Sequence, residues 1–262
     1  MSNQQETILI PPRLVRGDAI GLISPAGALN AERQQRLQHG VAYLRQQGFD
    51  IREGQFLREQ HGYLAGTDEQ RVSELNDMLA NPAIKAIFCT RGGYGINRIL
   101  DQVDYEAARN MPKIIVGYSD ITALQLALFA TIGLVTFSGP MVAIEMGESL
   151  PDLTHNELWN TLMQPQKHLY SAQIGDHAYH TYSPGIAKGR LLGGCLSVLV
   201  TLLGTPFLPD LSGAILLLED IGEDLYKIDR YFSQLKNAGV LNAVAGVILG
   251  HFVDIHPDEN HN

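Results

Sequence analysis

The sequence lacks any uninterrupted apolar run near the roughly 20 residues that a membrane-spanning helix needs. Its N-terminus lacks the basic start, apolar middle and small-residue cleavage site of a secretory signal. These absences exclude a membrane-embedded protein and predict a cytoplasmic one. The chain has 262 residues, of which 45% are hydrophobic and 18% charged, a composition that is ordinary for a globular enzyme and allows two domains.

Cysteine is scarce, and basic residues are not clustered. Cys89 ends an apolar run and Cys195 follows a pair of glycines, so both are interpreted as small buried residues, and no disulfide is expected. The net charge is −9, and no Lys/Arg cluster is available to neutralise phosphates, which argues against a nucleic-acid partner. The expected partner is a small molecule or a peptide.

The motifs that bind nucleotide cofactors and metals are also missing. The turn "RGGYG" (Arg91 to Gly95) matches neither the dinucleotide fingerprint nor a phosphate-binding loop, because G-x-G-x-x-G and Gly-Lys-Ser/Thr are absent. No H-E-x-x-H occurs, and His177 and His180 form a lone pair in a polar loop. The sequence therefore predicts no cofactor and no metal.

The first half of the chain alternates strand-like and helix-like segments, as successive βα units do. Helical patterns occupy residues 30–48, 67–82 and 121–133, and a short helix is expected from Ile96. Strands are expected within residues 18–27, 49–54, 83–90, 113–120 and 134–140. Five such units predict an α/β fold with an open, mostly parallel sheet that is covered by helices on both faces.

The second half divides into two regions. Residues 151–184 are polar and have little periodicity, so they are interpreted as a linker region with one short helix around Trp159. From residue 185 a second unit begins, with "GRLLGGCLSVL", the strand "AILLLED", the helix "LYKIDRYFSQLKNAG" and the strand "AVAGVILGHF". The predicted domains are a larger α/β domain at 1–150 and a smaller C-terminal α/β domain at 185–262.

The stretch "KIIVGYSDIT" places Ser119 where a buried strand meets a helix. A serine on such a turn exposes its hydroxyl above the sheet, as in a nucleophile elbow, although Ile121 stands where the usual pattern has its second glycine. The alternative interpretation is that Ser119 or Asp120 only caps the helix that follows. The "RGGYG" turn has a similar alternative, namely a tight turn without function.

Acidic residues follow the strand of the second unit. Glu219 and Asp220 end an apolar run, and Glu223 and Asp224 come soon after. Acids at a strand exit are usually solvated, so this position alone does not indicate catalysis. Arg91, at another strand exit, has the chemistry to hold a substrate carboxylate, but arginines at strand ends are usually solvated or paired with a neighbour.

Several stretches resemble, in order, those of one enzyme family. They are "GDAIGLISPAG", "AGTDEQRVSELNDML", "TRGGYG", "VGYSDIT", "SGP", "LLGGCLSVL" and "LLLEDIGEDLYKIDR", and they extend over most of residues 8–253. On these motifs the chain resembles the LD-carboxypeptidase family of serine peptidases, which includes murein tetrapeptide carboxypeptidases and the microcin C7 self-immunity enzymes.

The resemblance implies a nucleophile on the N-terminal domain and the other triad members on the C-terminal domain. Position by position, Ser119 matches the nucleophile and Glu219 the acidic triad member. The turn Gly92-Gly93 and the N–H of Asp120 match the oxyanion hole. The implied reaction removes the terminal D-residue, typically D-alanine, from murein tetrapeptides during cell-wall recycling in the cytoplasm, and the implied assembly is a homodimer.

The triad histidine of that family lies in a Gly-His-Gly-type turn, some tens of residues after the strand that matches "AVAGVILGHF". The sequence reaches Asn262 without such a turn. We therefore expect a C-terminal domain that is shortened relative to the family and an activity that is reduced, because a serine without its base is a poor nucleophile. Among His251, His256 and His261, His251 is the candidate for a substitute base, since it lies on a predicted strand.

Three other functions stay open at this stage. One is a peptidyl-nucleotide-cleaving immunity enzyme, and another is a protein that binds muropeptides without cleaving them. A nucleotide-binding regulator that uses "RGGYG" is the third, but the ribose-binding acid of such proteins is missing.

Overall fold

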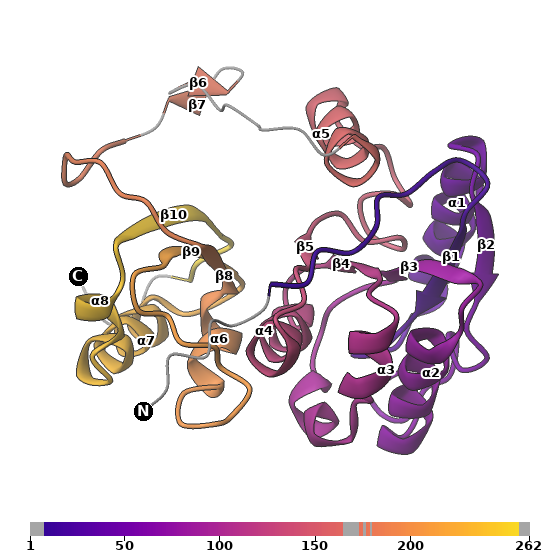
Figure 1. The fold of residues 1–262 in the computed structure, drawn as a ribbon, viewed down its shortest axis with the longest axis horizontal. Helices are drawn as coiled ribbons and strands as arrows, with labels where there is room; N and C mark the ends of the chain where they lie inside the picture. Colours follow the sequence, from indigo (N-terminus) through magenta and orange to yellow (C-terminus); the bar gives the residue numbers. More distant parts are fainter. Residues whose placement is uncertain (1–7, 165–172, 175–176, 179, 257–262) are drawn as a thin grey trace.

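The computed structural model describes residues 8–164, 173–174, 177–178 and 180–256. Within them the chain forms two parallel sheets, each with its own helices, that lie side by side (Figure 1). None of the helices in these ranges has the length and apolar character of a membrane span. The predicted α/β fold with a larger parallel sheet and a smaller C-terminal unit is confirmed.

The N-terminal sheet has five parallel strands in the order β2-β1-β3-β4-β5. All five strands lie within the stretches predicted from the sequence. Their bounds are β1 Ala19–Ile23, β2 Asp50–Glu53, β3 Ile84–Cys89, β4 Ile114–Gly117 and β5 Phe137–Ser138. Because all five are parallel, their carboxyl ends meet at one edge of the sheet, where "RGGYG" and "GYSD" both begin.

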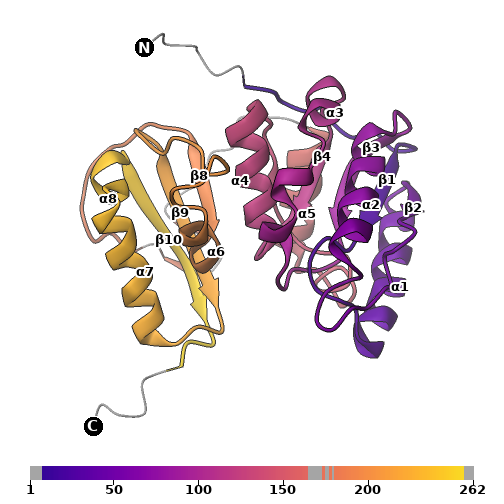
Figure 2. The same ribbon diagram turned by 90° about the horizontal axis from the view of Figure 1, so that it is seen from below.

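Helices cover both faces of this sheet (Figure 2). Helices α1 (Ala31–Gln46) and α5 (Asp152–Met163) pack on one face, and α2 (Asp68–Ala80), α3 (Tyr105–Asn110) and α4 (Ile121–Ile132) pack on the other. In β3, Phe88 faces the first layer and Cys89 the second, which is the alternation of a strand buried on both sides. Two short 3₁₀ helices, η1 (Ile96–Arg98) and η2 (Leu100–Gln102), follow the glycine-rich turn.

The starts and ends of the predicted helices follow local rules. Thr67 caps α2 in a reciprocal capping box with Gln70, and Gly48 follows the end of α1 with a φ of 93°. The helix expected around Trp159 is α5. Its indole stacks on Phe49 and Phe88, so this helix packs on the N-terminal sheet although it lies in the stretch interpreted as a linker region.

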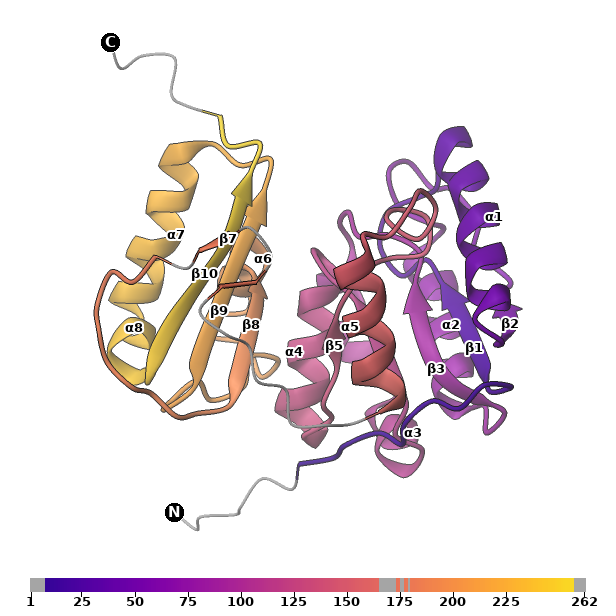
Figure 3. The same cartoon turned by 90° about the horizontal axis from the view of Figure 1, so that it is seen from above.

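The C-terminal sheet has three parallel strands in the order β10-β9-β8. The elements of this half are β6 (Gln173–Ile174), β7 (His177–Ala178), β8 (Leu191–Cys195), α6 (Leu196–Thr201), β9 (Ile215–Ile221), α7 (Leu225–Asn237), α8 (Val240–Ala243) and β10 (Gly246–Val253). Strand β8 is the edge of this sheet that faces α4 of the N-terminal unit (Figure 3). The two units therefore meet along α4 and β8.

Candidate active site

Ser119 lies on the sharp turn between β4 and α4. Its φ of 62° falls in the left-handed region, which costs an L-residue on the order of 1–2 kcal/mol. The side chain is half-buried, and its hydroxyl makes no hydrogen bond to any described residue. The buried strand and helix on either side impose this backbone, which gives the serine the geometry of a nucleophile elbow.

The capping alternative for this turn is wrong. Asp120 occupies the N-cap position of α4, but neither its side chain nor that of Ser119 makes a capping hydrogen bond. The Asp120 carboxylate instead accepts a hydrogen bond of 3.0 Å from the backbone N–H of Ile96. Asp120 thereby fastens the elbow to the segment that follows "RGGYG", so the two strand exits are connected.

The glycine-rich turn lies directly against the serine. A Cβ atom built on Gly92 would stand 2.8 Å from the Ser119 Cβ and 3.0 Å from its Oγ, closer than side chains pack. Gly93 and Gly95 have φ angles of 125° and 132°, which suit glycine alone. The turn thus needs glycine at 92 for space and at 93 and 95 for backbone shape, and it brings backbone amides next to the hydroxyl.

Arg71 connects the glycine-rich turn to the exit of β1, a role that the sequence did not predict. It is fully buried in α2, and its guanidinium donates to the carbonyl oxygens of Pro25 and Gly95 at 2.7 and 3.0 Å and pairs with Asp68. Arg71 therefore ties the exits of β1 and β3 together. The available signal was its position four residues before Leu75, on the inward-facing side of the helix.

Asp120 gives a prediction for the pH dependence of stability. Burial raises the pKa of its carboxyl to about 6, against the lowering effects of the Ile96 N–H and the Arg71 charge. A raised carboxyl pKa means that the folded state prefers the protonated form, so this group's contribution to stability falls as pH rises from about 4 to above 6. Because the pKa is raised by about two, the stability contributed by this group falls by at most about 3 kcal/mol over that pH range.

The side chain at position 120 cannot titrate in the variant Asp120→Asn. The difference in free energy of unfolding, wild type minus variant, should therefore decrease as the pH rises through the same range. Urea denaturation at several pH values measures both. Asp229→Asn, which changes one exposed acid of α7, is the control and should give parallel curves. Parallel curves for Asp120→Asn as well would show that the carboxyl of Asp120 has an ordinary pKa.

Glu219 and Asp220 point to opposite sides of β9. Asp220 is buried and accepts hydrogen bonds from the backbone N–H and the hydroxyl of Ser197, so its side chain caps α6. This burial differs from the solvated state that is usual for acids at a strand exit. Glu219 is half-buried on the other side, where burial and the charge of Asp220 raise its pKa. Its charge also contributes to raising the pKa of Tyr118, after burial and Glu145. Glu219 therefore lies near the residue that precedes Ser119.

A direct contact between the two units explains this proximity. The backbone N–H of Cys195, at the end of β8, donates to Thr122 Oγ1 of α4 at 3.2 Å. Gly194 permits the contact, since a Cβ there would stand 2.6 Å from the same oxygen. Cys195 pairs with Glu219 in the sheet register, and Thr122 lies three residues after Ser119. The structure thus brings Ser119 and Glu219 to the same junction.

His251 lies beside Glu219 in the sheet. The register of β10 shifts so that Gly250 and His251 together oppose Glu219 of β9, which is a β-bulge. His256 lies beyond the end of β10, where its backbone forms hydrogen bonds with the backbones of Glu223 and Leu225. His261 falls outside the described residues. In the described part of the chain, no group of three or more potential metal ligands occurs.

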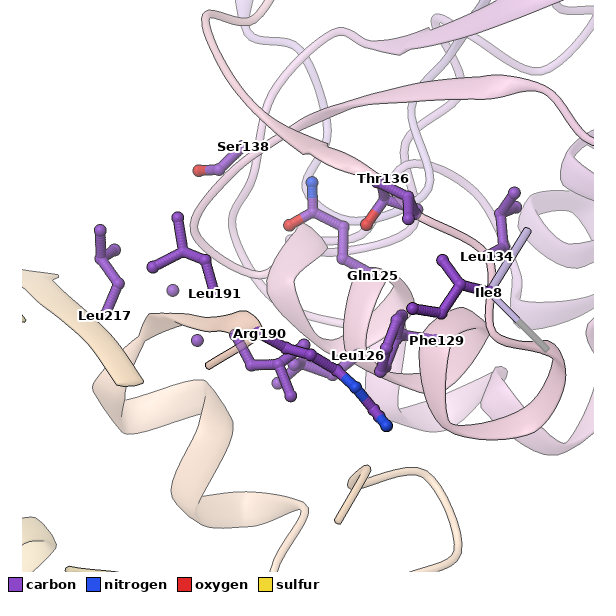
Figure 4. Close-up of a pocket in the computed structure, with 14 residues that line it drawn as sticks. Ile8, Gln125, Leu126, Phe129, Leu134, Thr136, Ser138, Arg190, Leu191 and Leu217 are labelled. Atoms are coloured by element: carbon purple, nitrogen blue, oxygen red, sulfur yellow. The ribbon is translucent and has the colours of Figure 1, made fainter. Parts of the chain in front are cut away.

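An apolar cavity of about 310 Å³ continues the junction between the units. Figure 4 shows Leu191 and Leu217 of the C-terminal sheet on one side of the cavity and Leu126 and Phe129 of α4 on the other, with Arg190 extending from the C-terminal unit toward Phe129. The Arg190 guanidinium lies 5.8 Å from the centre of the Phe129 ring. Leu217 is two residues before Glu219 on the same side of β9, so this cavity can receive an aliphatic group that extends from the junction.

The two cysteines have no part in this site's chemistry. Both are free and buried, as the sequence predicted. Burial raises the pKa of each thiol to about 12, so neither is a thiolate near neutral pH.

Comparison with known proteins gives matches across both units. Residues 20–139 match the LD-carboxypeptidase N-terminal domain, and residues 188–262 match the LD-carboxypeptidase C-terminal domain. A Bacillus subtilis protein named probable murein peptide carboxypeptidase is 38% identical over 248 residues, which are 94% of this chain and 76% of that protein.

Solved structures agree with these matches. The microcin C7 self-immunity protein MccF, in complex with aspartyl sulfamoyl adenosine, superposes with a TM-score of 0.87 at 30% identity, covering 97% of this chain and 83% of that one. Muramoyltetrapeptide carboxypeptidase from Oxalobacter formigenes superposes with a TM-score of 0.79 at 31% identity, covering 90% and 77%. On both domains and on the overall fold, the chain belongs to the LD-carboxypeptidase family.

Proposed function

We propose that this protein is a cytoplasmic serine carboxypeptidase that removes the terminal D-alanine from murein tetrapeptides during cell-wall recycling. The observation that carries the proposal is Ser119, an accessible hydroxyl held in a left-handed backbone against the Gly92 turn. The names of the relatives, murein peptide and muramoyltetrapeptide carboxypeptidase, support the substrate class.

In the proposed reaction, Ser119 Oγ attacks the carbonyl carbon of the residue before D-alanine and transfers its proton to a base. The N–H groups of Gly92, Gly93 and Asp120 stabilise the negative charge that develops on the carbonyl oxygen. The C–N bond then breaks, the proton passes to the departing amine, and water hydrolyses the acyl-serine ester. The products are D-alanine and the shortened peptide.

Glu219 is proposed to orient and stabilise the imidazole that serves as the base. Within the described residues, His251 is the histidine that the bulge of β10 brings next to Glu219, so it is our candidate for this role. A carboxylate that is half-buried, with a raised pKa, gains from a cationic partner during the proton transfer.

The proposal is tested by incubating the protein with a tetrapeptide that ends in D-alanine and detecting the released amino acid by mass spectrometry. A peptide that ends in L-alanine should be cleaved much more slowly. Glu219→Gln should reduce release by about 10²- to 10⁴-fold, whereas Glu106→Gln, at an exposed site of α3, should not. Intact tetrapeptide that binds but stays uncleaved would instead indicate the muropeptide-binding protein.

A second candidate substrate is a peptidyl nucleotide. The observation in its favour is the similarity to MccF, whose solved complex contains aspartyl sulfamoyl adenosine. The same Ser119 chemistry would apply, and competition between this compound and the tetrapeptide for the protein would measure which group the site prefers. The homodimer that the family resemblance implies stays a prediction, which light scattering can check.

A further inference from the structure

A hollow of about 420 Å³ lies beside the glycine-rich turn, at the carboxyl edge of β1 and β3. Two arginines line it, Arg91 at the exit of β3 and Arg33 in the first turn of α1. The side chain of Arg91 is seated between two glycines: a Cβ built on Gly27 would stand 3.0 Å from its guanidinium carbon, and one built on Gly93 would stand 3.3 Å from Nη2. The backbone is thus shaped around this guanidinium.

The positive charge in this hollow is not neutralised by the described residues. Arg91 donates from Nη1 to the Ala28 carbonyl oxygen at 2.7 Å, but its Nε is buried and has no hydrogen-bond partner. Neither Arg33 nor Arg91 forms an ion pair with a described carboxylate, whereas Arg36, one turn further along α1, pairs with Glu32 and Glu148. Two neighbouring guanidiniums without a counter-charge favour binding of an anion.

Two further features favour an anion here. Burial lowers the pKa of Arg91, and the charge of Arg33, which lines the same hollow, adds to this lowering. The N-terminal end of α1, capped by Asn30, also points into the hollow and adds partial positive charge. An anion bound between the arginines would relieve the repulsion between the two positive charges.

The hollow adjoins the proposed oxyanion turn, because Gly93 of that turn lines it. Gly92, which lies against the Ser119 hydroxyl, stands between Arg91 and Gly93 in the chain. In a peptide cleaved at its last bond, the terminal carboxylate is one residue, or about 3.8 Å, beyond the scissile carbonyl. A carboxylate is planar and accepts two hydrogen bonds from the fork of one guanidinium.

We propose that Arg33 and Arg91 form the subsite for the terminal carboxylate of the residue that is released, and that this pair makes the enzyme an exopeptidase. The inference rests on the proposed function, since it places the released residue next to Ser119. It adds a specificity determinant: a peptide whose C-terminus is an amide, or is extended by further residues, loses the charge that the two arginines recognise.

Binding measurements test the proposal independently of catalysis. In a Ser119→Ala background, calorimetry compares the tetrapeptide acid with the same peptide carrying a C-terminal amide. The acid should bind on the order of 10- to 100-fold more tightly, and Arg91→Gln or Arg33→Gln should remove most of that preference. Arg45→Gln, at an exposed position near the other end of α1, is the matched control and should keep it.

Arg91→Gln also removes a hydrogen bond to the Ala28 carbonyl oxygen and can disturb the local fold. Arg33→Gln is therefore the second variant, since it removes the charge without removing that bond. Equal affinity for the acid and the amide in the starting protein, or an acid preference that survives in both glutamine variants, would overturn the subsite. An acid preference that depends on the arginines in a chain that releases no D-alanine would uphold the subsite and refute the hydrolase. In an active chain, the same substitutions should raise KM for the acid more than they lower kcat.

Discussion

Ser119→Ala should reduce release of D-alanine from a murein tetrapeptide by at least about 10⁴-fold. In the proposed reaction the hydroxyl forms the bond to the substrate, and alanine has no group that could replace it. The variant should keep the fold, because alanine carries a Cβ as serine does and meets a similar steric penalty at this φ, and the Ser119 hydroxyl makes no hydrogen bond to a described residue. Timed mass spectrometry of the products measures the rate.

Ser73→Ala, on the exposed side of α2, serves as the control and should release D-alanine at the wild-type rate. A second readout is the acyl-serine ester, which should be trapped on acid quenching of the wild type and be missing from Ser119→Ala. Undiminished release by Ser119→Ala would mean that another group carries out the attack, and the assignment of the elbow would be wrong.

Gly92→Ala should lower the same rate by about 10²-fold or more, although it adds a single methyl group. The new Cβ would stand 2.8 Å from the Ser119 Cβ, and neither atom can move freely, because one belongs to a strained turn and the other to the turn beside it. Relief requires a shift of the backbone amides that are proposed to hold the oxyanion. Substrate affinity should change much less than the rate.

Gly185→Ala is the matched control, since nothing lies within 4 Å of a Cβ built at that position and its backbone is not left-handed. Circular dichroism and thermal unfolding would show whether Gly92→Ala stays folded. A folded Gly92→Ala protein with the wild-type rate would show that the glycine serves only the shape of the turn.

The sequence was sufficient for most elements of this fold and insufficient for their contacts. Hydrophobic patterns that repeat every two or every 3.6 residues predict the five strands and their main helices. They also place the candidate catalytic residues at strand exits. Helix α3 escaped prediction because it is short, with only Ala108 of its six residues buried. Its N-cap, Asp104, accepts from Ala107 and was the available local signal.

The contacts that build the site join distant residues. Arg71 reaches the exits of two strands, and Asp220 caps a helix that begins more than twenty residues earlier, so neither role has a local signature. The choice between capping and an elbow at Ser119 also depended on tertiary structure. Asp120 was drawn away from the helix end by the N–H of Ile96, which the chain places there only after it folds.

The hydrogen bond between Cys195 and Thr122 has a consequence for motion of the two units. If the C-terminal sheet rotates relative to α4, this hydrogen bond lies at the pivot of the motion. Thr122 is three residues after Ser119, and Cys195 is paired with Glu219 in the neighbouring strand. Groups near the pivot of such a motion move least, while the outer strand β10 moves furthest. Hinged opening would therefore admit a bulky peptide and yet leave the spacing of hydroxyl and carboxylate almost unchanged.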